Sequence, residues 1–178
     1  MLAPEAWVPL AEVMRPHGLR GEVKLKVFNE DSGVLLSQED VLLRLGSGEE
    51  HEVSVDRARR AGTAILMKLY SIDDCDRASE LRGALVCARR GSFPALDEGE
   101  FYTCDVLGAR VLLWSGSDWE ELGTVHAVQS YPSADALVVR AADGGKDWEV
   151  PLLDSFVENV DVVLGVVKLS KLDGLERG

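Results

Sequence analysis

One stretch close to the N-terminus decides the fold class: His17-Gly18-Leu19-Arg20-Gly21-Glu22-Val23-Lys24-Leu25-Lys26-Val27. Its two glycines bracket a short turn and can adopt positive φ without a Cβ penalty. The residues after the turn alternate, which places three apolar side chains on one face of a strand and three charged ones on the other. The stretch therefore predicts a β-hairpin corner, with His17 and Arg20 exposed at its tip.

Strand patterns dominate the rest of the chain. In the first half, alternating or β-branched residues predict strands at 9–15, 21–27, 41–45, 51–56, 65–69 and 85–89. In the second half, shorter strands are predicted at 110–114, 123–129, 136–141, 148–152 and 162–169, separated by turn clusters rich in Gly, Ser and Asp. The pattern predicts a mainly β protein with two β-barrels, the first of about six strands and the second smaller.

One helix interrupts the strands of the first half. Asp73 or Ser71 is the predicted N-cap, and Gly83 is the predicted C-terminal stop. Asp74 and Asp76 then lie in the first turn, and Ala78 and Leu81 share one face. A second, short helical turn is predicted at 34–37.

A boundary follows the sixth strand. Residues 89–100 lack periodicity and contain Gly and Pro, as a linker does. We therefore expect a domain over 1–92, a linker over 93–99 and a second domain over 100–178.

Charge is divided unevenly between these halves. The chain of 178 residues has a net charge of −12; residues 1–92 carry 13 Lys and Arg against 15 Asp and Glu, whereas residues 93–178 carry 6 against 16. Since the phosphates of nucleic acid are bound by Lys and Arg, the acidic second half is a poor general binder of nucleic acid and suits a basic protein partner. Plain solubility is the alternative explanation for this acidic half.

No apolar run approaches the roughly 20 residues of a membrane helix, and the start lacks signal-peptide features, so we expect a cytoplasmic protein.

Catalytic and cofactor motifs are missing from the sequence. It contains no phosphate-binding glycine loop, no dinucleotide fingerprint and no nucleophile elbow. Cys75, Cys87 and Cys104 are too widely spaced for zinc or redox pairs and predict buried, reduced thiols. The sequence predicts no metal, no cofactor and no enzymatic activity.

Two features of the sequence are candidates for binding. The glycines of the turn match the Gly-x-x-Gly of KH domains, but a KH loop joins two helices, so an exposed structural turn is the better interpretation. In residues 100–108, Phe101 and Tyr102 are adjacent; on an extended segment they point to opposite faces, so one is available as a partner anchor. An aromatic plug between the domains is the alternative. Trp114, Trp119 and Trp148 are expected to pack the second barrel rather than to form a contact patch.

Several motifs, in order, resemble the RimM family of bacterial ribosome maturation factors. They are His17-Gly18-Leu19-Arg20-Gly21-Glu22-Val23-Lys24, Ile65-Leu66-Met67-Lys68-Leu69, Asp76-Arg77-Ala78-Ser79-Glu80-Leu81-Arg82-Gly83, Pro94, Phe101-Tyr102, Asp105-Val106-Leu107-Gly108, Glu121-Leu122-Gly123-Thr124-Val125, Leu137-Val138-Val139 and Glu149-Val150-Pro151. Each motif is weak alone, but together they cover nearly the whole chain with family-like spacing.

The resemblance implies a translation-factor-like N-terminal barrel and a PRC-type C-terminal barrel. It also implies a monomeric, non-catalytic assembly chaperone that binds the immature small (30S) ribosomal subunit and supports head assembly and 16S rRNA processing. The expected protein partner is the head ribosomal protein numbered nineteen, with Phe101, Tyr102, Asp105 and Tyr131 as contact residues. Because Phe101 lacks the hydroxyl of the family's usual tyrosine, Tyr102 is the better polar contact. For contact with rRNA or the subunit we expect His17, Gly18, Arg20, Gly21, Lys24 and Lys26, with Arg57, Arg59 and Arg60 on the same barrel.

Two rival functions remain open at this point. An rRNA-processing nuclease or a flavin-linked reductase is disfavoured by the missing metal cluster and glycine loop. A PRC-barrel adaptor unrelated to ribosomes keeps the fold but leaves the N-terminal motif unexplained.

Overall fold

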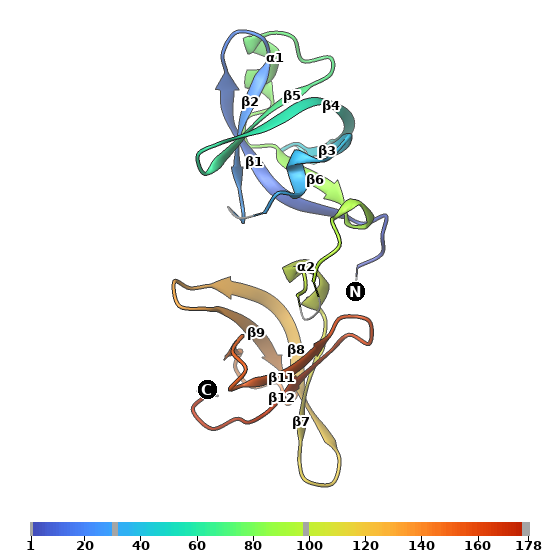
Figure 1. The fold of residues 1–178 in the computed structure, drawn as a ribbon, viewed down its shortest axis with the longest axis vertical. Helices are drawn as coiled ribbons and strands as arrows, with labels where there is room; N and C mark the ends of the chain where they lie inside the picture. Colours follow the sequence, from blue (N-terminus) through green and yellow to red (C-terminus); the bar gives the residue numbers. More distant parts are fainter. Residues whose placement is uncertain (1, 30–31, 98–99, 176–178) are drawn as a thin grey trace. The chain divides into compact units, whose positions relative to one another are not determined.

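The computed structural model describes residues 2–29, 32–97 and 100–175 (Figure 1). The chain divides into two compact units, one over Ala3–Ala95 and one over Leu96–Gly178. Each unit is built on a six-stranded sheet, and the helices are short, which confirms the predicted mainly β class. In the part of the chain that the structure describes, no helix is long and apolar enough to cross a membrane.

The first unit is a closed barrel with the strand order β1-β2-β5-β4-β3-β6. Its strands are β1 (Trp7–His17), β2 (Glu22–Val27), β3 (Asp40–Arg44), β4 (Glu50–Ala61), β5 (Ala64–Leu69) and β6 (Leu85–Arg89). All six predicted strands are present. The fourth is longer than predicted because a bulge between Val55 and Arg57 shifts the alternation, which hides the strand pattern of its charged second half.

Alternation along the strands fills this barrel. Val23, Leu25 and Val27 of β2 are buried, and their β5 neighbours Ile65 and Met67 are fully buried. The charged residues of β2 point to the other side of the sheet, as predicted.

The predicted helix is present as α1 (Cys75–Glu80), but neither Asp73 nor Ser71, the two predicted candidates for its N-cap, is the N-cap. Asp74 is the N-cap, and its carboxylate accepts a hydrogen bond from the backbone N–H of Arg77 at 2.8 Å. Asp73 instead pairs with the ammonium group of Lys68 at 3.0 Å, and Ser71 adopts a positive φ of 70°. The predicted helical turn is the 3-10 helix η1 (Val34–Leu36), and a second 3-10 helix, η2 (Arg90–Ser92), follows β6.

The second unit contains a six-stranded half-barrel with the order β10-β9-β8-β7-β12-β11. Its strands are β7 (Arg110–Trp114), β8 (Trp119–Ser130), β9 (Asp135–Ala141), β10 (Trp148–Pro151), β11 (Val157–Asp161) and β12 (Val166–Leu169). The pairing of β7 with β12 is parallel, and the other pairs of this sheet are antiparallel.

Three elements of the second unit differ from the sequence-based expectation. Strand β11 was not predicted, and the strand predicted at 162–169 begins only at Val166. The carboxylate of Asp161 accepts hydrogen bonds from the N–H groups of Val163 and Leu164 at 3.0 and 2.9 Å, which closes a turn there. Residues 103–106, predicted to be extended, form the helix α2 (Thr103–Val106).

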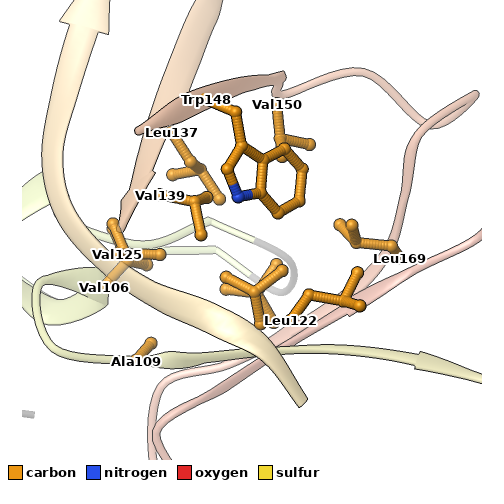
Figure 2. Close-up of a cluster of buried hydrophobic side chains, with 11 residues drawn as sticks. Val106, Ala109, Leu122, Val125, Leu137, Val139, Trp148, Val150 and Leu169 are labelled. Carbon is orange, nitrogen blue, oxygen red and sulfur yellow. The ribbon is translucent and has the colours of Figure 1, made fainter. Parts of the chain in front are cut away.

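Trp148 lies in the core of the second unit, as expected, and is only 3% exposed (Figure 2). Leu122, Leu137, Val139 and Val150 belong to the same cluster of buried side chains. The packing expectation is wrong for Trp114, which is 50% exposed. Its ring meets that of Trp119 edge to face, with 5.4 Å between centroids, across the β7–β8 hairpin.

Candidate nucleic-acid interface

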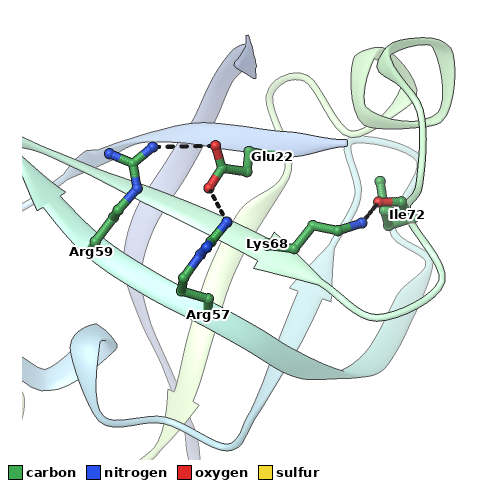
Figure 3. Close-up of polar contacts among 5 residues, drawn as sticks. All are labelled: Glu22, Arg57, Arg59, Lys68 and Ile72. Carbon is green, nitrogen blue, oxygen red and sulfur yellow. Dashed lines mark hydrogen bonds and ion pairs between the residues drawn. The ribbon is translucent and has the colours of Figure 1, made fainter. Parts of the chain in front are cut away.

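The turn between β1 and β2 is held in place by its glycines. Gly18 and Gly21 have φ values of +69° and +74°, as the sequence predicted. Gly21 is buried against the backbone of Ile72: a Cβ at Gly21 would lie 2.0 Å from the carbonyl oxygen of Ile72. The same carbonyl accepts a hydrogen bond from the ammonium group of Lys68 (Figure 3).

This anchored turn presents its middle residues to solvent. His17 and Arg20 are exposed, and Leu19 between them is 85% exposed. Gly21 itself offers no surface to a partner, because it is buried. Its role in the turn is to allow the close approach to Ile72.

Positive charge gathers on the outward side of four neighbouring barrel strands, β1, β2, β5 and β4. Since alternate residues point outward, the pairing of the strands defines which side chains share this side. We call the following set the cationic face: Arg15, Lys24, Lys26, Lys68, Arg57 and Arg59, with the carboxylates Glu12 and Glu22. Even with Lys68 paired to Asp73, the five other cations outnumber the two carboxylates and make the face positive, within a chain of net charge −12.

Glu22 organises two of these cations. Its carboxylate accepts hydrogen bonds from the guanidinium groups of Arg57 at 3.1 Å and Arg59 at 3.3 Å (Figure 3). The Glu22 side chain is 14% exposed, whereas those of Arg57 and Arg59 are 62% and 48% exposed. The two guanidinium groups are therefore positioned by a largely covered carboxylate and still face solvent.

Arg15 and Lys24 stand directly opposite each other on β1 and β2. Within residues 2–29, 32–97 and 100–175, neither side chain forms an ion pair with a carboxylate. Like charges opposite each other in a sheet destabilise it. An anion bound between the two side chains would relieve this repulsion.

The remaining basic residues of the barrel are differently placed. Lys26 lies opposite Glu12 across the β1–β2 pair. Arg60 lies opposite the buried Ile65, and its guanidinium group donates a hydrogen bond to the carbonyl oxygen of Ser32 at 2.8 Å. Arg60 is therefore left out of the cationic face. Arg15 and Lys68 belong to it but were not singled out in the sequence, because only the strand register places them there.

The expected contact residues of the second unit are less accessible than the sequence suggested. Phe101 and Tyr102 are both half-buried, and Phe101 packs against the core cluster. Asp105 is 2% exposed, and the thiol of Cys104 lies 4.0 Å from its carboxylate. The expectation of opposite faces assumed a strand, whereas Tyr102 is the N-cap of α2. Asp105 is thus part of the interior and does not contribute to a contact surface.

Tyr131 is 45% exposed and lies beside Glu149 of strand β10. Its hydroxyl donates to the carboxylate of Glu149, with oxygen–oxygen distances of 2.9 and 3.0 Å. This hydrogen bond is the main reason that the pKa of Tyr131 is raised above its usual value. Tyr131 therefore fixes the position of an exposed carboxylate.

Titratable side chains do not gather into a metal site in the described residues: no group of three His, Cys, Asp or Glu side chains could hold an ion there. Cys87 is buried, whereas Cys75 and Cys104 are only half-buried, so the expectation of buried thiols holds for one of the three. Burial raises the pKa of the Cys87 thiol.

Known proteins are similar to this chain over nearly its whole length. Residues 8–93 match the family model of the RimM N-terminal domain. A ribosome maturation factor RimM from Sorangium cellulosum is 46% identical over 169 residues, which are 95% of this chain and 97% of that protein. One from Geobacter metallireducens is 33% identical over 175 residues and covers 98% of both chains. The solved structure of a 16S ribosomal RNA processing protein RimM from Pseudomonas aeruginosa covers 93% of this chain and 98% of its own, with a TM-score of 0.47 and 24% identity.

Proposed function

Because this chain belongs to the RimM family of ribosome maturation factors, we propose that it acts on the immature 30S subunit by occupancy, without catalysis. The N-terminal barrel contacts 16S rRNA through the cationic face and the turn that carries His17, Gly18 and Arg20. The C-terminal unit contacts a basic head ribosomal protein, the one numbered nineteen. The protein holds the two in a productive arrangement and then leaves, as a cytoplasmic monomer.

The cationic face carries the rRNA part of this proposal. Phosphate contacts made by Lys and Arg supply most of the non-specific affinity for nucleic acid. Arg57 and Arg59 offer planar guanidinium groups already oriented by Glu22. Arg15 and Lys24 lie opposite each other without a carboxylate partner among the described residues. An RNA backbone supplies the negative charge that this face lacks.

The charge of the second unit supports a basic protein partner. Residues 93–178 contain 6 Lys and Arg against 16 Asp and Glu. Charge complementarity of this kind raises the rate of association more than the final affinity. Tyr131 with its bound Glu149 is one proposed contact, and the half-buried Tyr102 is the other.

Two single substitutions that change the charge of the cationic face in opposite directions test the rRNA contact. We expect Lys24→Gln to weaken binding of the intact protein to precursor 16S rRNA about 3- to 10-fold and to lower the salt dependence by about one phosphate contact. Glu22→Gln removes the negative charge beside Arg57 and Arg59 but keeps an oxygen that can accept a hydrogen bond from a guanidinium group, so it is expected to strengthen binding a few-fold. Filter binding over a range of salt concentrations measures both.

The stability cost of Glu22→Gln is expected to be small. Its two arginine partners are about half exposed, so the ion pairs contribute about 1 kcal/mol or less to stability.

The rRNA contact would be overturned if both variants bound RNA as the parent protein does, or if the parent protein did not bind precursor rRNA at low salt.

A further inference from the structure

Two exposed aromatic rings continue the outward rows of the cationic face. Phe28 follows the buried Val27 at the end of β2 and is 54% exposed; its N–H donates to the carbonyl oxygen of Leu10 at 2.9 Å, which extends the strand pairing. Tyr70 follows the buried Leu69 at the end of β5 and is 57% exposed. Its N–H donates a hydrogen bond to the carbonyl oxygen of Ser54 at 3.0 Å. Because successive strand residues point to opposite sides, both rings lie on the outward side.

The two rings mark opposite ends of the face. Strands β2 and β5 are antiparallel, with Glu22 opposite Lys68 and Lys26 opposite Ala64. Phe28 therefore lies beyond Lys26, and Tyr70 lies beyond Lys68. At about 3.3 Å per residue, the rings are roughly 25 Å apart along the strands. The cations lie between them, and the Tyr70 end is the less positive one because Asp73 pairs with Lys68.

Neither ring is engaged by another aromatic ring or by a cation among the described residues. In the part of the chain that the structure describes, Phe28 and Tyr70 form no ring–ring or cation–ring contact, and the hydroxyl of Tyr70 forms no hydrogen bond. Other exposed aromatic residues are differently engaged; Trp114, for example, pairs with Trp119. Phe28 and Tyr70 thus leave about half of their surface open to solvent at the two ends of a row of cations.

We propose that the cationic face binds single-stranded RNA, with unpaired bases stacked on Phe28 and Tyr70 and the intervening phosphates on the cations. The inference rests on the proposed rRNA contact and specifies the kind of RNA. Surfaces that combine a cationic track with aromatic rings bind single strands, because each stacked base adds about 1–3 kcal/mol. In a duplex the base faces are stacked on one another and cannot reach the rings.

The test compares the intact protein's affinity for two probes: a mixed-sequence RNA of about 12 nucleotides, a length that small barrels accommodate, and the same sequence as a duplex. We expect the single strand to bind more tightly. Phe28→Ser and Tyr70→Ser should each weaken its binding roughly 5- to 100-fold and leave the salt slope unchanged. Lys24→Gln should instead lower that slope by about 0.7.

Two controls separate stacking from folding defects. Phe28→Tyr keeps a ring and should bind nearly as the parent protein does. Trp114→Ser removes a similarly exposed ring from the other unit and should leave RNA binding unchanged. Equal or tighter binding of the duplex, or normal single-strand binding by both serine variants, would overturn the inference and leave the rRNA contact standing. Failure to bind either probe at low salt would overturn the rRNA contact itself.

Discussion

Replacing Gly21 by alanine is expected to destabilise the N-terminal barrel by about 3–5 kcal/mol. The new Cβ would lie 2.0 Å from the carbonyl oxygen of Ile72, and the φ of +74° is strained for any residue with a Cβ. Backbone strain and overpacking each cost about 1–3 kcal/mol. Relief requires Ile72 to move, which also breaks its contact with Lys68. Urea unfolding of the intact protein, followed by circular dichroism, measures the loss.

Gly18→Ala is the matched control. Gly18 has nearly the same φ, +69°, but a Cβ there would meet no atom within 4 Å. Only the conformational penalty of about 1–2 kcal/mol remains. If the two substitutions cost the same, the close approach of Gly21 to Ile72 does not anchor the turn.

Replacing Trp148 by alanine is expected to destabilise the C-terminal unit by about 3–5 kcal/mol. Its ring is 3% exposed and belongs to the same buried cluster as Leu137, Val139 and Val150. Truncation removes the largest apolar side chain of this core and leaves a cavity that the surrounding structure fills only in part. The midpoint of urea unfolding, read from the remaining tryptophan fluorescence, reports the change.

The same truncation at Trp114 provides the comparison. Trp114 is half exposed, and its contact with Trp119 contributes about 0.5–1.5 kcal/mol. A loss at Trp114 as large as that at Trp148 would contradict the assignment of Trp148 to the core.

Side-chain periodicity and glycine conformation are enough to predict most strands and the first turn from the sequence. The alternation around Val23 and Leu25 and the positive φ of Gly18 and Gly21 follow from side-chain period and from the missing Cβ, so they could be predicted. The helix cap could not be chosen between neighbouring acids, because Asp73 is engaged by Lys68 from another element. At 162–165, the apolar run Val162-Val163-Leu164 imitates a strand, and only the hydrogen bonds of Asp161 reveal the turn.

The candidate site also contains residues that the sequence predicts and residues that only the strand pairing reveals. Lys24 and Lys26 were recognised from the strand that carries them. Arg15 and Lys68 were not, since their place beside Lys24 and Glu22 depends on the cross-strand register. Asp105 was expected at a surface because the sequence gives no sign that its side chain turns inward. The sequence pattern within one β-strand thus does not show which residues of distant segments lie side by side.

Co-sedimentation with immature and mature small subunits tests the central claim most directly. The intact protein is compared with Arg15→Gln/Lys24→Gln, which removes two cations without breaking an ion pair that the structure records, and with Tyr102→Ala. We predict binding to the immature particle in preference to the mature one, weakened at least about 10-fold in the double variant and lowered in Tyr102→Ala. Equal binding to both particles, or undiminished binding by a folded double variant, would contradict the account.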